Sequence, residues 1–321
     1  MKNKILRFTL CLALLGAAVR APAQTYTTLD DPSGNGGTYA YGISGNNVVG
    51  WYANGSSQLG FLYNGSTYTT LTDPLSIVTT INGPVANGNY AYGISGNNTV
   101  GLYYWNAPVN GVSGYSGFLY NGSTYTTLSD PLSVSTAPQG ISGNNIVGYY
   151  MDSSSKEHGF LYNGSTYTTL DDPLGTMATS ARGISGNNVV GTYSTSSSGG
   201  SFLYNIGAGT YTTLSDPLGI YTAAFGISGN NIVGAYYDSS FNQHGFLYNI
   251  GTGTYTTVDD PLGVKGTEVL GVDGNNVVGT YFDSSDVPHG FETTVGPVPE
   301  PTTLALAGLG GLSLLLFRRR K

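Results

Sequence analysis

One motif returns six times along the chain and constrains its fold more than any other feature. The hexapeptide "GISGNN", followed by an apolar stretch that ends in glycine, has five copies, and "GVDGNNVVG" is a sixth. The copies begin at Gly42, Gly93, Gly140, Gly183, Gly226 and Gly271. Their spacings of 51, 47, 43, 43 and 45 residues leave room for about four short strands each. The repeat therefore predicts an all-β, six-bladed β-propeller with one blade per unit.

The strands of one unit can be placed on the sequence. In the first unit "AYGIS" and "VVGWY" flank a Gly-Asn-Asn turn, and "GFLY" and "STYTTL" flank Asn64-Gly65. An Asn-Gly pair between two strands predicts a two-residue type I′ turn, whose central residues both need a positive φ. Each unit thus predicts two hairpins, with strands a, b, c and d in chain order. Disorder is the competing interpretation of so polar a composition, but aromatic residues, 12% of the chain, recur at fixed positions.

A count of the strands predicts how the ring closes. Strands a, b and c occur six times, whereas strand d, "YTTL" or "YTTV" before Asp-Pro, follows strand c only five times. The missing copy stands at the start of the repeat region, at Tyr26 to Leu29. We expect it to pair with the last unit and close a ring over residues 24–296, which removes open sheet edges. An open β-solenoid is the alternative, because a period alone does not require closure.

The first residues, "MKNKILRFTLCLALLGAAVRAPAQ", run from a basic segment through an apolar one to "APA". This order predicts a signal peptide over residues 1–23, cut by signal peptidase between Ala23 and Gln24. The apolar stretch is short of the roughly 20 residues that a membrane anchor needs. The only cysteine, Cys11, lies in this segment, so the exported chain has no disulfide.

The last residues, 297–321, combine three features in a fixed order. A Pro-Glu-Pro triplet is followed by an apolar run and then by four cations. The residues concerned are Pro299, Glu300, Pro301, Arg318, Arg319, Arg320 and Lys321. The apolar run is short and Gly-rich for a membrane span, while the four cations would hold the end of the chain on the cytoplasmic side; a plain tail anchor is one interpretation.

This three-part segment resembles the PEP-CTERM sorting signal of Gram-negative bacteria, with residues 299–301 as the recognition triplet. The resemblance implies transient anchoring in the inner membrane by a transmembrane helix in this segment, recognition by an exosortase, and delivery to the cell surface or the extracellular matrix. Such signals are associated with bacteria that make exopolysaccharide, which is therefore a candidate partner. Whether the segment is cleaved or transferred to another molecule stays open.

The repeats also resemble the extracellular HAF-repeat family, through "HGFLYNGSTYTTL", "HGFLYNIGTGTYTTV" and "GISGNNIVG". The departures are glycine for the middle alanine of the His-Ala-Phe triplet and tyrosine for the usual tryptophan. The resemblance implies an extracellular propeller-like protein and supplies no catalytic residues.

The charge of the repeat region excludes one class of partner. Between residues 24 and 298, Lys156, Arg182 and Lys265 oppose seventeen acids, which is a net charge of −14. Nucleic-acid binding relies on lysine and arginine at the phosphates, so we expect no nucleic acid. An anionic polysaccharide is repelled as well unless a divalent cation bridges the two.

Three groups of residues could support metal or acid-base chemistry. His158, His244 and His289 occupy one repeat position in three blades, so the ring holds them apart and a packing or turn role is expected. Asp152, Asp238 and Asp283 suggest calcium, but no bidentate glutamate ends their loops; Asp-Ser turns are favoured and no cofactor is expected. The Asp-Pro pairs are spread around the ring as turn initiators, too far apart for a glycosidase pair. They stand at Asp31, Asp73, Asp130, Asp172, Asp216 and Asp260.

The second unit carries the best candidates for a ligand site. Both large insertions, in "PLSIVTTINGPVANGNYAYG" and "YYWNAPVNGVSGYSG", touch this blade, on the face of the b-to-c and d-to-a loops. Variable loops on a rigid scaffold are where binding usually resides, and aromatic faces with amide groups suit neutral sugars. The candidates are Asn87, Asn89, Tyr90, Tyr104, Trp105, Asn106 and Tyr115. The alternative is that Trp105 only folds its loop onto the blade.

Taken together, these features predict a secreted cell-surface or exopolysaccharide-matrix protein that binds a partner or serves as structure, without catalysis. A lectin-like propeller with its site on the second-blade loops is one alternative. A polysaccharide-active enzyme is another, although no nucleophile-base pair or carboxylate pair breaks the repeat symmetry.

Overall fold

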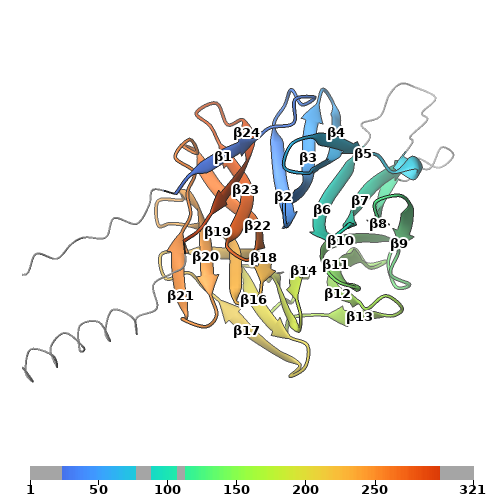
Figure 1. Ribbon diagram of the computed structural model, residues 1–321. Coiled ribbons are helices and arrows are strands. Elements are labelled where there is room, and N and C mark those ends of the chain that lie inside the picture. Colours follow the sequence, from blue (N-terminus) through green and yellow to red (C-terminus); the bar gives the residue numbers. More distant parts are fainter. Residues whose placement is uncertain (1–23, 77–87, 107–112, 297–321) are drawn as a thin grey trace, which may run out of the picture.

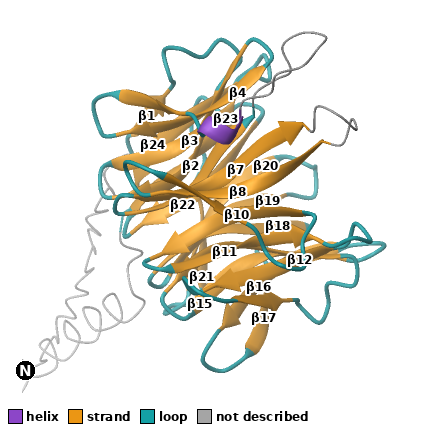
Figure 2. Ribbon diagram, turned by 90° about the vertical axis from the view of Figure 1, so that its right-hand side faces the viewer, coloured by secondary structure: helices purple, strands orange, loops and turns teal. Residues whose placement is uncertain are grey.

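The computed structural model describes residues 24–76, 88–106 and 113–296, which form a six-bladed β-propeller (Figure 1). Within these residues the chain forms 24 strands and one short 3-10 turn, η1 (Pro74–Ser76) (Figure 2). Every blade is four antiparallel strands in the order a-b-c-d. Parallel bridges join the third and fourth blades, at Glu157 and Ala178, and the first and second blades, at Gln58 and Gly88. The predicted fold is confirmed, and the ring excludes the solenoid.

The two inner strands of each blade carry the repeated motif. The a strands are β2 (Thr38–Ser44), β6 (Asn89–Ser95), β10 (Ser135–Ser142), β14 (Ala178–Ser185), β18 (Tyr221–Ser228) and β22 (Gly266–Asp273). The b strands are β3 (Asn47–Asn54), β7 (Asn98–Asn106), β11 (Asn145–Met151), β15 (Asn188–Ser194), β19 (Asn231–Tyr237) and β23 (Asn276–Phe282).

The two outer strands form the second hairpin. The c strands are β4 (Ser57–Tyr63), β8 (Ser113–Tyr120), β12 (Glu157–Tyr162), β16 (Gly199–Asn205), β20 (Gln243–Asn249) and β24 (Pro288–Thr294). The d strands are β5 (Tyr68–Leu71), β9 (Tyr125–Leu128), β13 (Tyr167–Leu170), β17 (Thr210–Leu214), β21 (Thr254–Thr257) and β1 (Tyr26–Leu29).

The N-terminal strand closes the sixth blade, as the strand count predicts. Strand β1 lies beside β24 (Figure 1) and pairs with it antiparallel, from Tyr26 opposite Thr293 to Leu29 opposite Gly290. The side chain of Leu29 is 2% exposed and joins the apolar cluster between the sixth and first blades. The opening strand of the chain therefore completes its last repeat.

Glycine and phenylalanine explain why the repeat is so constant. A Cβ atom on Gly42 would lie 2.8 Å from the backbone oxygen of Tyr92 in the next blade, and Gly271 is as crowded against Tyr41 where the ring closes. The inner strands can therefore approach one another only through glycine. The glycine that ends each b-strand motif makes room for a phenylalanine of strand c that is 0% exposed, as at Gly50 and Phe61.

One predicted turn type is wrong. Asn64-Gly65 does not form a two-residue type I′ turn, because only Gly65 has a positive φ, 91°. The loop spans the four residues between Tyr63 and Tyr68, and the Asn64 side-chain oxygen accepts hydrogen bonds from the backbone amides of Ser66 and Thr67. The asparagine side chain thus replaces a backbone partner, which relieves the need for a second positive φ.

Candidate functional site

The predicted ligand residues of the second blade belong to a longer line of aromatic side chains. Ring centroids of neighbours along this line are 4.2, 5.2, 5.8, 5.9 and 6.3 Å apart, and the line crosses from the first blade to the third. We call it the aromatic row; it consists of Tyr39, Trp51, Tyr90, Tyr104, Tyr115 and Tyr149. Tyr104, near its middle, is 42% exposed.

Four phenols of the aromatic row keep their protons at neutral pH. Burial raises the pKa of Tyr90 to about 12, and it also raises the pKa values of Tyr39, Tyr115 and Tyr149. Each of these hydroxyls can therefore donate a hydrogen bond as well as accept one. The row offers apolar ring faces together with neutral hydroxyl groups.

Trp105 holds its own hairpin together. Its Nε1–H donates a hydrogen bond to Ser116 Oγ at 3.1 Å, across strands β7 and β8. The half-buried indole packs against the apolar cluster between the first and second blades, which includes Val49 and Leu71. These contacts support the alternative that Trp105 folds its loop onto the blade, whereas the ring of Tyr104 is exposed to solvent.

The three predicted asparagines differ in position. Asn89 begins β6 and is 1% exposed, and its amide has no hydrogen-bond partner within the described part of the chain. Asn106 ends β7, and Asn87 lies outside the described residues. The structure therefore brings the tyrosines of the predicted set together on a surface and places Asn89 beneath it.

The three histidines each lie between two aspartates. In each case Nδ1 of the histidine is 2.7 Å from Oδ2 of the aspartate that precedes an Asp-Pro pair. Its Nε2 is 3.5 to 3.7 Å from Oδ2 of the aspartate in the b-to-c loop. The imidazole ring stacks on a tyrosine of strand b. We call this arrangement the Asp-His-Asp clasp; its members are Asp152-His158-Asp171, Asp238-His244-Asp259 and Asp283-His289-Asp30. The three histidines thus make packing and turn contacts within their own blades.

The sequence carries a signal for the clasp that the motifs above do not include. Units with histidine end strand d in "DDP", whereas the other units end it in "TDP" or "SDP". The "DDP" that begins at Asp30 supplies the aspartate that pairs with His289, so this sequence signal also identifies the closing strand β1. Within the described residues no group of three or more His, Cys, Asp and Glu side chains is arranged to hold a metal ion.

The Asp-Pro residues form buried turns, as predicted. Their side-chain oxygens accept a hydrogen bond from the backbone amide two residues later at 2.8 to 2.9 Å, in five of the units. Burial raises the pKa of Asp172, Asp216 and Asp260, and each backbone amide of these three donates to a threonine of strand a. These carboxylates serve the d-to-a connection.

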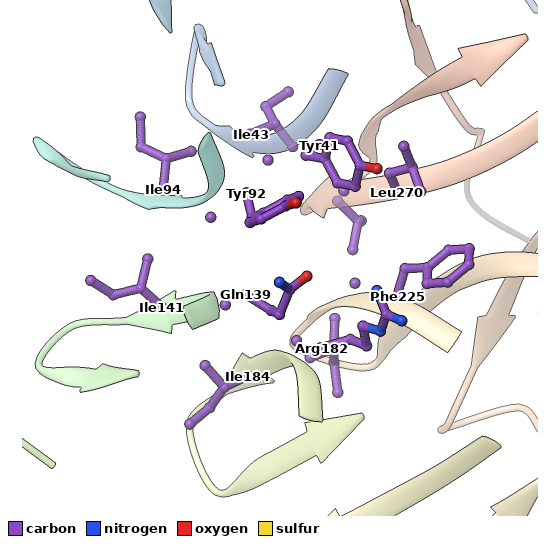
Figure 3. Close-up of a pocket in the computed structure, with 18 of the residues that line it drawn as sticks. Tyr41, Ile43, Tyr92, Ile94, Gln139, Ile141, Arg182, Ile184, Phe225 and Leu270 are labelled. Atoms are coloured by element: carbon purple, nitrogen blue, oxygen red, sulfur yellow. The ribbon is translucent and has the colours of Figure 1, made fainter. Parts of the chain in front are cut away.

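A cavity of about 310 Å³ on the ring axis was not predicted from the sequence (Figure 3). Its wall repeats a tripeptide from every blade, in which a variable residue precedes glycine and isoleucine or valine. Each variable residue lies at a register shift between strands a and b, a β-bulge that re-aims the side chain. The six are Tyr41, Tyr92, Gln139, Arg182, Phe225 and Leu270.

Comparison with known families identifies the C-terminal segment. Residues 297–321 match the PEP-CTERM protein-sorting motif, which implies export to the cell surface and processing by an exosortase. This segment, with residues 299–301 and 318–320, lies outside the described residues, as does the predicted signal peptide including Ala23; Gln24 is exposed. Within the described part of the chain no helix has the length and apolarity to cross a bilayer.

No curated protein matches this chain significantly. Among solved structures, TolB from Acinetobacter baumannii has 14% identity and a TM-score of 0.49, with 80% of this chain and 63% of TolB covered. The chain thus spans less than two thirds of the length of TolB.

Two further propellers resemble the chain at low identity. The β-propeller domain of the Trilobed protease from Pyrococcus furiosus has 8% identity and a TM-score of 0.47, with 83% of this chain and 97% of that domain covered. Aleuria aurantia lectin in complex with alpha-methyl-L-fucoside has 14% identity and a TM-score of 0.43, with 74% and 77% covered.

Proposed function

We propose that this chain is a non-catalytic binding protein of the cell surface or exopolysaccharide matrix, exported by a signal peptide and with extracellular repeats of the HAF type. The proposed ligand is a neutral glycan, bound along the aromatic row. One observation carries this proposal: six aromatic rings are in contact across three blades, and Tyr104 stands exposed among them. Stacked rings with neutral hydroxyls fit the apolar C–H faces and the hydroxyl rims of sugars.

The charge of the protein supports a neutral ligand over an acidic one at this surface. The repeat region carries a net charge of −14, and the row holds no cation. A polyanion would approach against this field. A neutral sugar chain is indifferent to it and gains contact area from each ring.

The experiment is a calorimetric titration of the full-length chain in detergent with neutral oligosaccharides of four to six units. We expect saturable binding that Tyr104→Ala abolishes. Tyr221→Ala is the matched control, because Tyr221 is 37% exposed and lies in the fifth blade, outside the aromatic row.

Two results would contradict the proposal. Absence of binding by the wild-type chain, to these sugars and to the polysaccharide of the producing cell, would leave a purely structural surface protein. Release of shorter sugars from that polysaccharide would instead make the chain an enzyme.

A further inference from the structure

The axial cavity contains a position of the repeat that holds five different residue types in the six blades. The residues that follow it, glycine and then isoleucine or valine, are needed six times over for the inner strands to fit. The residue before them ranges from tyrosine to glutamine, arginine, phenylalanine and leucine. Because the fold accepts all five types there, it does not dictate any of them. Their convergence on one cavity gives that cavity a particular, asymmetric lining.

Arg182 is the only cation among the described residues that line this cavity. Its guanidinium lies 5.8 Å from the ring centroid of Phe225, and the two side chains lie next to each other in Figure 3. Within the described residues the Arg182 side chain makes no hydrogen bond, its Nε is inaccessible to solvent, and every ion pair under 4 Å involves a histidine instead. The Nε–H is therefore buried without a partner, which is costly, so the cavity favours a group that supplies one to the guanidinium.

The one acid among the described residues that line the cavity is already engaged. Glu268 lines the same cavity, and its Oε1 accepts a hydrogen bond from Gln243 Nε2 at 2.6 Å. Burial raises the pKa of Glu268, while this hydrogen bond and the charge of Arg182 oppose the rise. With Glu268 nearby and the whole ring acidic, a single negative charge can be accommodated, whereas a polyanion is disfavoured.

The other residues that line the cavity indicate which chemical groups the rest of a ligand would carry. Tyr41 and Tyr92 contact each other edge to face at 4.9 Å on the wall that also holds Gln139, and Phe225 lies beside Arg182. These groups surround one space (Figure 3) and offer aromatic surface with a few polar groups. A volume of about 310 Å³ is at the lower end of ligand pockets and admits one six-membered ring with substituents.

We propose that the axial cavity binds a small monocarboxylate built on a single six-membered ring, with the carboxylate on Arg182 and the ring among Tyr41, Tyr92 and Phe225. A planar guanidinium pairs two N–H groups with two carboxylate oxygens, which makes it a suitable partner. The proposed ligand differs from the neutral glycan, and the cavity adjoins the aromatic row, whose Tyr39 and Tyr90 stack on Tyr41 and Tyr92. The ring can come from an acidic sugar or from an aromatic acid, which the experiment distinguishes.

The test is a calorimetric titration of the full-length chain in detergent with glucuronate and with phenylacetate, and with glucose as the uncharged control. We expect saturable binding of one or both acids and none of glucose. Binding of glucuronate alone identifies an acidic sugar, and binding of phenylacetate alone identifies an aromatic acid. Binding of glucose with the same affinity as glucuronate would overturn the proposal.

Three variants locate the charge. Arg182→Gln should weaken acid binding by about tenfold or more, because it removes the charge-assisted pair. Lys265→Gln removes the same charge from an exposed loop and should leave the affinity unchanged. Glu268→Gln removes the competing negative charge and should tighten binding a few-fold. Equal affinities of the Arg182→Gln variant and the wild type, both with an unchanged melting temperature, would overturn the proposal.

The outcome is independent of the proposed glycan site. Tyr104→Ala should leave the affinity for the acids intact, and Arg182→Gln should leave neutral oligosaccharide binding intact. If the wild-type chain binds neither acid, the axial site is wrong even where the glycan titration succeeds.

Discussion

The second and sixth blades hold the same hairpin together with different chemistry. In the sixth blade Asp283 and His289 stand across the b-to-c hairpin, and the histidine also reaches Asp30 of the N-terminal strand. In the second blade Trp105 occupies the position of Asp283, Ser116 that of His289, and an indole N–H bonds a hydroxyl. These two blades therefore link the hairpin at the same position with different groups. Of the two, only the sixth uses ionisable side chains, and only its link ties both ends of the propeller.

The largest expected effect comes from removing the strand that makes the sixth blade different. Deletion of residues 24–32 removes β1 and the buried Leu29, and it exposes the edge of β24. We expect the free energy of unfolding to fall by more than about 4 kcal/mol and the protein to associate through that edge. Thermal unfolding and light scattering measure both. A monomer with an unchanged melting temperature would show that closure contributes nothing.

Trp105→Ala tests the cross-link of the second blade. Loss of the indole from the interface between the first two blades should cost about 2 to 3 kcal/mol, since the ring is only partly buried. Trp105→Phe, which keeps most of the packing and loses the N–H, should cost about 1 kcal/mol. Tyr104→Ala, at the exposed neighbour, should stay within about 0.5 kcal/mol. Chemical denaturation measures these, and equal costs for Trp105→Ala and Tyr104→Ala would remove the structural role of the indole.

The clasp of His244 should make stability depend on pH where the Trp105 link of the second blade does not. Burial lowers the pKa of His244, but hydrogen bonds and charges of Asp259 and Asp238 outweigh this, and the net shift is upward. The stabilisation is therefore complete below the unfolded-state pKa of about 6.5 and is lost as pH rises through the folded-state pKa. His244→Gln should cost more stability at pH 5.5 than at pH 8.5, by denaturation at each pH. An effect that grows with pH would contradict this sign, and Trp105→Phe is the control without a titrating group.

The smallest expected effect concerns the backbone strain in the b-to-c loops that carry the clasp aspartates. The fourth residue of each loop that begins at a clasp aspartate has a positive φ without being glycine, as at Ser155, Phe241 and Asp286. Phe241 is 76% exposed and has a φ of 64°. Asparagine tolerates this region better, so Phe241→Asn should raise the free energy of unfolding by about 0.5 kcal/mol. A loss of stability would show that the phenylalanine ring makes a favourable contact.

The sequence alone predicted the architecture, because the same pattern of strands occurs in six successive units. The count of strand d located the closing strand, and "DDP" at residues 30–32 could have confirmed it through His289. The Asn-Gly turn was misassigned because the Asn64 side chain competes with the backbone for amide partners, which dipeptide preferences do not weigh.

The candidate sites depend on contacts between blades that no single repeat reveals. Alternation along a strand cannot place Arg182 on the axis, because a β-bulge interrupts the alternation at that residue. The direction of the Trp105 ring is set by the neighbouring blade, through residues such as Val49. The aromatic residues of the second blade were found because the insertions beside them break the repeat, although the structure places them in strands β6, β7 and β8 and not in loops.

The pairing of β1 with β24 also has a mechanical meaning. Strand β24 directly precedes the sorting segment, so a pull on that segment enters the ring through Thr294. Without β1, strand β24 would be the edge of its sheet, and a pulling force could separate it from β23 one hydrogen bond at a time. With β1 it lies inside the sheet, bonded to β23 on one side and β1 on the other. A tether at this end therefore has to break two ladders before the ring begins to unravel.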